Sequence, residues 1–214
     1  MFENITKARM YSYLTGIFCA LMIMSNILGT KTLKIEFIML PCSILVFPLL
    51  FIVNDILSEI YGFTMTKNVI LLGFVLNIIA VVMYSIAIIL PSNSPTADAF
   101  STILGTTPRL FIAGLISYIL SNLINSKIMV KLKEKYYNFL FVRCIVSTAV
   151  GEAIDSIIFI TFAFYGVFSN ELIITMICCQ VIFKVLYEFI IYPVTRKVIH
   201  HIRTLDDGEL ENII

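Results

Sequence analysis

Acidic and amide side chains recur at helical spacing inside the apolar stretches of this 214-residue sequence. Glu152 and Asp155 are three residues apart, and Gln180, Lys184 and Glu188 follow one another every four residues. Each set would therefore share one face of a helix. Carboxylates accept hydrogen bonds, whereas ammonium and amide N–H groups donate them. The two sets together predict a buried site that is rich in acceptors and able to hold a polar ligand or a cation.

Two further pairs of polar residues lie in other apolar stretches. Asp55 and Glu59 are four residues apart, and Asn122 and Asn125 are three apart. Amides often hold membrane helices together, and we expect that structural role for Asn77 and Asn125.

The acids are too numerous for simple pairing. Lys184 could neutralise Asp155 or Glu152, but it is one cation among three carboxylates in the last two apolar stretches, and Asp55 adds a fourth. Because charges inside a membrane are costly, this excess favours a binding site. Glu59 and Glu188 lie nearer the ends of their stretches, where a solvated role competes with a binding role.

The composition places these residues in a membrane protein. Hydrophobic residues make up 59% of the chain and charged residues 14%, whereas an ordinary soluble domain has about 25% charged residues. The formal net charge of +1 argues against a nucleic-acid partner. The five cysteines lack the spacing of a metal site, so we predict no metal and no cofactor.

Six apolar segments are long enough to span a bilayer, which needs about 20 residues. The predicted fold is all-α: a single transmembrane domain of six helices followed by a polar tail at 193–214. The predicted helices cover 11–28, 41–60, 69–90, 110–128, 144–167 and 172–192.

The distribution of Lys and Arg predicts that both termini are cytoplasmic. The side of the N-terminus would carry Lys7, Arg9, Lys67, Lys127, Lys131, Lys133, Lys135, Arg143, Arg196, Lys197 and Arg203. The opposite side would carry Lys31, Lys34 and Arg109.

Two connecting segments are unusual. The stretch 31–41 is partly apolar but too short to span, and we expect an external loop or a short re-entrant hairpin. The stretch 91–108 holds Pro91, Pro95 and Pro108, which favours an exposed loop that could act as a lid. Arg109 follows it and could anchor the next helix at the headgroups or take part in a site.

Several strings that contain these polar residues resemble the queuosine precursor transporter family, which is also described as vitamin-uptake-like. The resemblance covers nearly the whole chain. It is carried by SNILGTKTL, FPLLFIVNDILSEIYG, LGTTPRLFIAGLISYILSNLINSKIMVKLK, STAVGEAIDSIIFITFAFYG and QVIFKVLYEFIIYPVT, in that order.

The resemblance implies a six-helix importer of the inner membrane. Its cargo would be a 7-deazaguanine precursor of queuosine, a modified tRNA base: 7-cyano-7-deazaguanine, 7-aminomethyl-7-deazaguanine or queuine. Where many relatives carry Gln, this chain has Asn122, which leaves the preferred precursor open. By motif position, the family's polar residues would fall on Asn26, Asp55, Glu59, Arg109, Asn122, Asp155, Gln180 and Lys184.

The chemistry of the residues fits such a cargo. The N1–H and exocyclic amine of a guanine-type edge can donate to one carboxylate, and its carbonyl oxygen can accept from an amide or an ammonium group. Asp155 or Glu152 would take the first role, and Gln180, Asn122 or Lys184 the second. A spare carboxylate such as Asp55 or Glu59 would favour the two cationic precursors.

Other readings of the sequence remain open. The chain could be a substrate-binding subunit for a vitamin-like molecule, energised by a separate module, and it could form a homodimer. We do not expect an enzyme, because no metalloprotease or serine-hydrolase motif is present, although an aspartyl mechanism using Asp55 and Asp155 is formally conceivable. The expected partners are a small molecule and membrane lipid.

Overall fold

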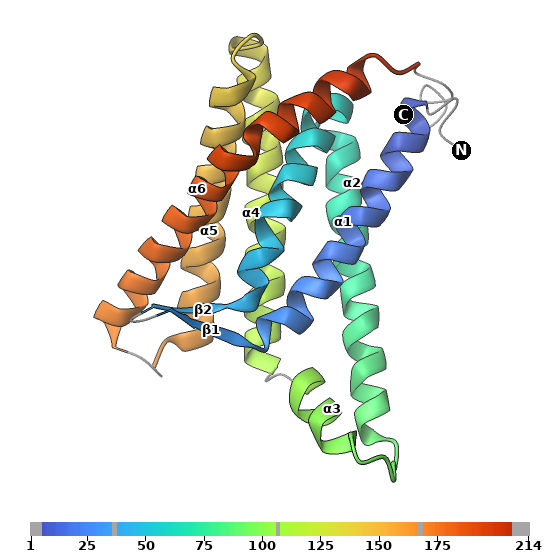
Figure 1. Cartoon of the computed structure of the whole chain (residues 1–214), viewed down its shortest axis with the longest axis vertical. Coiled ribbons are helices and arrows are strands. Elements are labelled where there is room, and N and C mark those ends of the chain that lie inside the picture. The colour runs from blue at the N-terminus through green and yellow to red at the C-terminus, as the bar shows by residue number, and fades with distance from the viewer. Residues whose placement is uncertain (1–5, 36–37, 106–107, 167–168, 207–214) are drawn as a thin grey trace.

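The computed structural model describes residues 6–35, 38–105, 108–166 and 169–206 (Figure 1). Of the helices in these ranges, α1, α2, α4, α5 and α6 are long and apolar enough to cross a membrane. The elements in chain order are α1 (Lys7–Gly29), β1 (Thr32–Ile35), β2 (Ile38–Pro41), a 3-10 helix (Cys42–Leu45), α2 (Phe47–Ile89), α3 (Ala97–Leu104), α4 (Pro108–Lys135), α5 (Leu140–Phe164) and α6 (Asn170–Arg203).

Helix α2 covers most of both the second and the third predicted spans. It has 43 residues and is interrupted only at Gly62, where φ is 78° and ψ is 177°. Glycine adopts this positive φ without the steric cost that a side chain would bring. Figure 1 shows the two arms, 47–61 and 63–89, folded back against each other. The connection between the predicted helices 41–60 and 69–90 is therefore a single-residue reversal, and the six predicted segments become five helices, one of them folded.

The segment before α2 holds two strands and one turn of 3-10 helix, which corrects the predicted start of the second helix and the all-α fold class. The predicted second helix was to begin at residue 41, but α2 begins at Phe47, with Pro48 in its first turn, where proline is tolerated. Strands β1 and β2 pair antiparallel, from Thr32 opposite Pro41 to Ile35 opposite Ile38. The fold is thus helical with one small hairpin, because paired strands satisfy backbone groups in a segment too short to span.

Two other boundaries differ from the sequence expectations. Part of the predicted loop 91–108 forms the short helix α3, none of whose residues is buried. The last span was expected to end at 192, yet α6 continues through Pro193 to Arg203. Ile199 and Ile202 are buried in this extension, so its apolar face packs on the bundle. Its polar residues made the same segment look like a solvated tail in the sequence.

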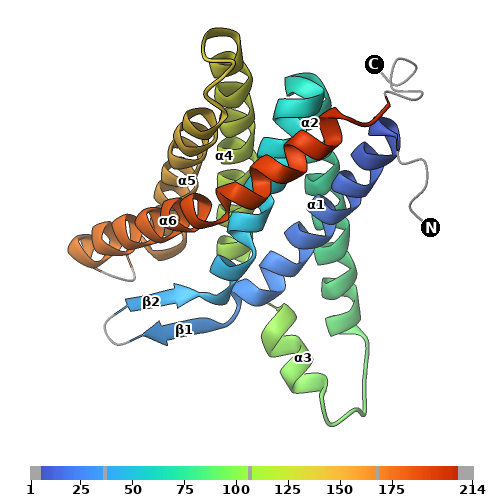
Figure 2. The same cartoon turned by 45° about the horizontal axis from the view of Figure 1, so that its top comes forward.

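The two ends of the bundle differ. Both termini lie at one end, together with the reversal of α2 and the connection between α4 and α5, whereas the β-hairpin and α3 lie at the other (Figures 1 and 2). The backbone N–H of Lys7 donates to the carbonyl of Asp206 (2.8 Å) and ties the two terminal helices together. Termini on one side agree with an even number of crossings, and we refer below to this side as the terminal end.

Candidate functional site

Lys184 joins two carboxylates in the interior of the bundle. Its Nζ lies 2.5 Å from Oε2 of Glu152 and 2.9 Å from Oδ2 of Asp155, both on α5. All three side chains are buried. Nζ also lies 4.7 Å from the centroid of the Phe47 ring at the start of α2, a cation–π contact. We call Glu152, Asp155 and Lys184 the lysine cluster.

The lysine cluster keeps unused hydrogen-bonding capacity. Oε1 of Glu152, Oδ1 of Asp155 and the hydroxyl of Ser156 are buried without a hydrogen-bond partner. Gln180 is also buried, one turn before Lys184 on α6. Since buried polar atoms are normally paired, these atoms mark a place that can receive a polar ligand.

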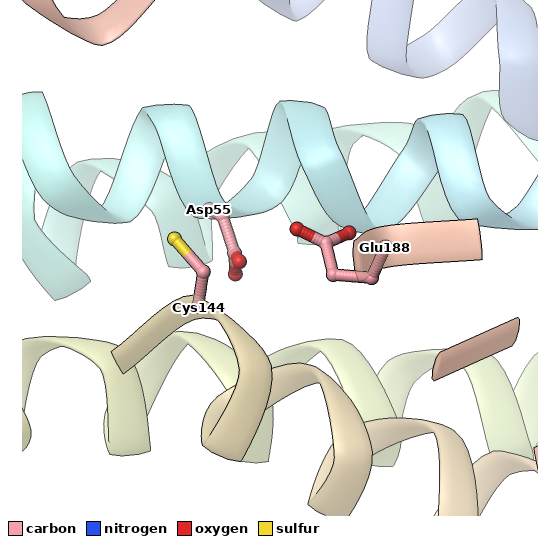
Figure 3. A group of neighbouring side chains, drawn as sticks. All are labelled: Asp55, Cys144 and Glu188. Atoms are coloured by element: carbon pink, nitrogen blue, oxygen red, sulfur yellow. The ribbon is translucent and has the colours of Figure 1, made fainter. Parts of the chain in front are cut away.

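Asp55 and Glu188 form a second centre. Asn125 on α4 donates to Oδ1 of Asp55 (2.9 Å), and Thr148 on α5 donates to Oδ2 (3.3 Å). Glu188 reaches the same place from α6, and ligand atoms of Asp55, Glu188 and Cys144 all lie within 4.8 Å of one another. Figure 3 shows the three side chains converging from their separate helices. We call Asp55 and Glu188 the acid pair.

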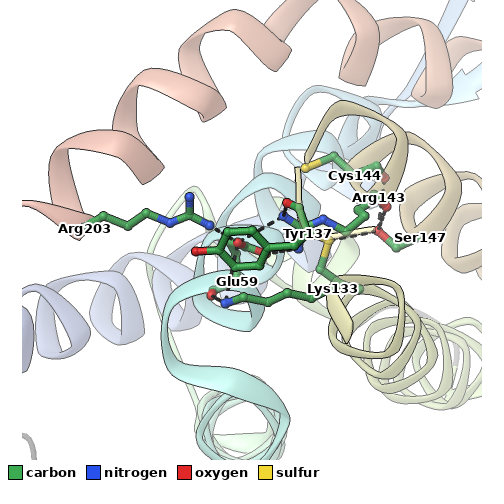
Figure 4. Close-up of polar contacts among 8 residues, drawn as sticks. Glu59, Lys133, Tyr137, Arg143, Cys144, Ser147 and Arg203 are labelled. Carbon is green, nitrogen blue, oxygen red and sulfur yellow. Dashed lines mark hydrogen bonds and ion pairs between the residues drawn. The ribbon is translucent and has the colours of Figure 1, made fainter. Parts of the chain in front are cut away.

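Glu59 forms a third centre at the terminal end of the bundle. Its carboxylate accepts from Arg143 on α5, whose Nη2 lies 3.1 Å from Oε1, and from Arg203 on α6. Lys133 on α4 bonds the carbonyl of Glu59 and places Nζ 3.6 Å from Oε1. Figure 4 shows the cations surrounding the single acid, with Tyr137 beside them. This cluster, called the Glu59 cluster below, ties α2, α4, α5 and α6 together.

The amides between α2 and α4 mainly hold these helices. Nδ2 of Asn122 donates to the carbonyl of Tyr118 in its own helix (2.9 Å), and Nδ2 of Asn54 donates to the carbonyl of Asn122 (3.3 Å). Oδ1 of both asparagines is buried and unpartnered. Asn122 therefore retains an acceptor near the centre of the bundle. Asn125, expected to link helices, does so by donating to Asp55 of α2.

Helix α5 packs closely against α2 and α4 at Gly151. At Gly151 on α5, an added Cβ would lie 2.8 Å from Cε1 of Phe51 and 3.0 Å from Cβ of Asn125. Glycine lets α5 approach both α2 and α4, as small residues do in membrane bundles.

Two predicted site residues are not brought to these centres by any contact that the structure gives. Nδ2 of Asn26 on α1 donates to Oδ1 of Asn77 on α2 (2.6 Å), which is a link between helices. The side chain of Arg109 lies outside the described part of the chain. Both remain predictions.

Sequence reasoning missed Arg143. It was counted among the cytoplasmic cations because the fifth helix was expected to begin at Cys144, but α5 begins at Leu140 and Arg143 is fully buried. A signal was available: Arg143, Ser147, Gly151 and Asp155 recur every four residues, which continues the polar face of α5 by one more turn.

An open pocket of about 770 Å³ lies at the terminal end, away from the lysine cluster. It is lined by residues of the α4–α5 connection and the last turns of α6, among them Tyr137, Tyr192, Arg196 and His200. No predicted site residue lines it.

The comparisons with known proteins identify the family of the chain. The family model for putative vitamin uptake transporters matches residues 41–198. A protein of Bacillus subtilis (strain 168) described as a probable queuosine precursor transporter is 25% identical over 151 residues, which cover 69% of this chain and 66% of the relative. The match therefore spans just under two thirds of that relative. No solved structure matches.

The matched region contains α2, α4, α5 and most of α6, and with them nearly every side chain of the three centres. With five apolar helices of spanning length, the protein is a multi-pass protein of the cell membrane. The chain belongs to the family of putative vitamin uptake transporters, as the strings in its sequence indicated.

Proposed function

We propose that this protein imports queuosine precursors across the inner membrane for tRNA modification, without a cofactor. The candidates are 7-cyano-7-deazaguanine, 7-aminomethyl-7-deazaguanine and queuine. Family membership and the description of the Bacillus subtilis relative support a transporter of this kind. The prevalence of Lys and Arg at the terminal end supports the proposal that both termini are cytoplasmic.

One observation carries the choice of site. Lys184 is shared by two buried carboxylates, each of which has an oxygen left without a partner. A guanine-type edge is complementary to this set, because its two N–H groups would donate to Asp155 or Glu152 and its carbonyl would accept from Lys184 or Gln180.

Substrate would compete with the existing ion pairs. Lys184 already occupies one oxygen of each acid, so a bound base would replace part of the Lys184 contact by its own N–H donors. The two arrangements are close in energy only if every buried charge stays paired in both. Such an exchange suits a carrier that must also release its substrate, in agreement with alternating access around a buried site.

Uptake in cells tests the cargo. Cells that cannot make queuosine and have no importer of their own would express this protein and receive each of the three precursors, with queuosine in tRNA as the readout. We expect queuosine to appear with at least one precursor. Its absence with all three, in cells where the protein reaches the membrane, would contradict the proposal.

Binding to purified protein tests the site. Lys184→Met and Asp155→Asn should each weaken binding of the accepted precursor about tenfold or more, as loss of a buried charge-assisted hydrogen bond requires. Lys197→Met is the control, because Lys197 is exposed on the same helix. Equal affinity in all four proteins would place the site elsewhere.

Reconstitution tests the alternative of an energised subunit. Purified protein in liposomes should exchange labelled for unlabelled precursor by itself. Precursor that binds but never crosses would instead favour a subunit that needs a separate module.

A further inference from the structure

The acid pair lacks what the other buried acids have. Glu152 and Asp155 share Lys184, and Glu59 faces two arginines and a lysine. Asp55 and Glu188 have no Lys or Arg within ion-pair distance among the residues that the structure describes, although both are almost completely buried.

Unpartnered atoms belong to the acid pair itself and to the amide that holds Asp55. Both carboxylate oxygens of Glu188 are buried without a hydrogen-bond partner, as is Oδ1 of Asn125, whose Nδ2 holds Asp55. Two carboxylates this close cannot both remain charged in a dry interior. Either a positive ion lies between them or one of them is neutralised.

The surroundings supply no other compensation. In the described part of the chain, Glu59 on α2 and Cys144 and Glu152 on α5 interact with a member of the pair, and Arg143 on α5 and Lys184 and Tyr192 on α6 interact with those residues in turn. Arg143 and Lys184 are committed to the other acids. From α4 the pair receives the neutral amide of Asn125.

The ligand set favours a monovalent cation. Calcium takes six to eight oxygen ligands, and magnesium keeps several waters in an octahedral shell, whereas this place offers two carboxylates and one amide oxygen within a closely packed interior. The Cys144 thiol is a poor ligand for hard cations, whether monovalent or divalent. A proton needs the two carboxylates alone, and a sodium ion could add the amide oxygen.

We propose that Asp55 and Glu188 bind one exchangeable monovalent cation between them, H⁺ or Na⁺, and that its movement drives uptake. The acid pair is assembled from α2 and α6, with Asn125 from α4 and Thr148 from α5. Any rearrangement of α6 against α2 would open or close this place. The coupling rests on the proposed transport function, whereas the cation site itself does not.

The first experiment needs no substrate. Purified protein is titrated with acid while the infrared band of protonated carboxyl groups is recorded, and its thermal midpoint is measured in NaCl and in choline chloride at equal ionic strength. A bound ion stabilises the folded state. We expect either an infrared band or a sodium-dependent midpoint that is lost in Asp55→Asn and Glu188→Gln. It should persist in Glu171→Gln, which makes the same change at an exposed position of α6.

The two outcomes separate the two ions. A Glu188-dependent infrared band identifies the proton, and a Glu188-dependent sodium effect identifies sodium. If neither signal differs between wild type and the two acid-pair variants, the cation site is refuted.

The second experiment tests coupling. In proteoliposomes, accumulation of the accepted precursor under an inward H⁺ or Na⁺ gradient is compared with exchange of labelled for unlabelled precursor, which needs no net ion movement. For Glu188→Gln we expect the ratio of accumulation to exchange to fall about tenfold or more. A factor of this size is typical of the coupling between two binding sites. Glu171→Gln should keep the wild-type ratio. An unchanged ratio in Glu188→Gln would refute coupling through the pair.

The design separates this inference from the proposed function. If the wild type neither binds nor exchanges any precursor while the infrared or sodium signal depends on Glu188, the cargo is wrong and the cation site stands. If exchange occurs without a Glu188-dependent signal, the cargo stands and the cation site is wrong.

Discussion

Asp55 and Glu59 are neighbours one turn apart on the same arm of α2, and both are buried, yet their surroundings are opposite. Glu59 is one acid among Lys133, Arg143 and Arg203. Asp55 faces a second acid, Glu188, with only neutral donors beside it. Burial is the same in the two places, so charge balance is what distinguishes them.

The difference separates a structural contact, the Glu59 cluster, from a candidate binding site, the acid pair. A buried acid with a buried arginine and further cations is compensated in the folded protein itself, and removing one partner leaves an uncompensated charge. A buried pair of acids is compensated only by something that arrives from outside the chain. The Glu59 cluster should therefore contribute to stability, and the acid pair to function.

The largest expected effect comes from removing the buried member of the Glu59 cluster. Arg143→Met should lower the free energy of unfolding by about 3–5 kcal/mol, because Glu59 loses its fully buried partner. Denaturation of purified protein in detergent measures this change. Arg196→Met, at an exposed position, should have little effect, and equal losses in both variants would contradict the distinction.

A steric change beside the acid pair should have an intermediate effect. Gly151→Ala places a methyl group against Phe51 and Asn125 and should cost about 1–3 kcal/mol of stability, as overpacking does. The matched control is Gly16→Ala, where an added Cβ meets nothing within 4 Å. If the two alanines behave alike in the same denaturation assay, the close approach of α5 is not a constraint.

A smaller effect is expected at the exposed edge of the Glu59 cluster. The side chain of Arg203 is 37% exposed although it bonds the same carboxylate as Arg143. Because water screens such pairs, Arg203→Met should cost only about 0–1 kcal/mol. Thermal midpoints of Arg203→Met and Arg143→Met, measured side by side, decide whether exposure ranks the two arginines in this order.

The smallest change in stability is expected at the acid pair. Glu188→Gln removes a buried carboxyl group that has no partner in the chain. In choline chloride, without sodium, it should leave the free energy of unfolding unchanged or raise it by up to about 1 kcal/mol. Glu59→Gln is the matched substitution and should be clearly destabilising. Greater destabilisation by Glu188→Gln than by Glu59→Gln would break the comparison.

Local spacing predicted much of this architecture. The four-residue spacing of Gln180, Lys184 and Glu188 identified a buried face of α6, and all three side chains are buried. The pairing of Lys184 with Glu152 or Asp155 was also foreseen, since one cation among three acids leaves few choices, although Lys184 in fact joins both. Whether these residues bind substrate stays a prediction.

The partners of Glu59 could not be predicted in the same way. Lys133, Arg143 and Arg203 come from three other helices, far from Glu59 in the sequence. No periodicity within one helix encodes such contacts, which depend on where helix ends meet. The helix boundary at Leu140 mattered most, because a start at Cys144 places Arg143 in solvent.

The reversal at Gly62 bears on how the chain enters the membrane. The arm 47–61 carries Asp55 and Glu59, each of which costs about 2.5–3.5 kcal/mol when a helix is inserted alone. The arm 63–89 has Lys67 near its start and is otherwise free of charged residues. Because one residue joins the arms, we expect them to enter as a hairpin in which the apolar arm carries the polar arm into the bilayer before α4, α5 and α6 are available to neutralise it.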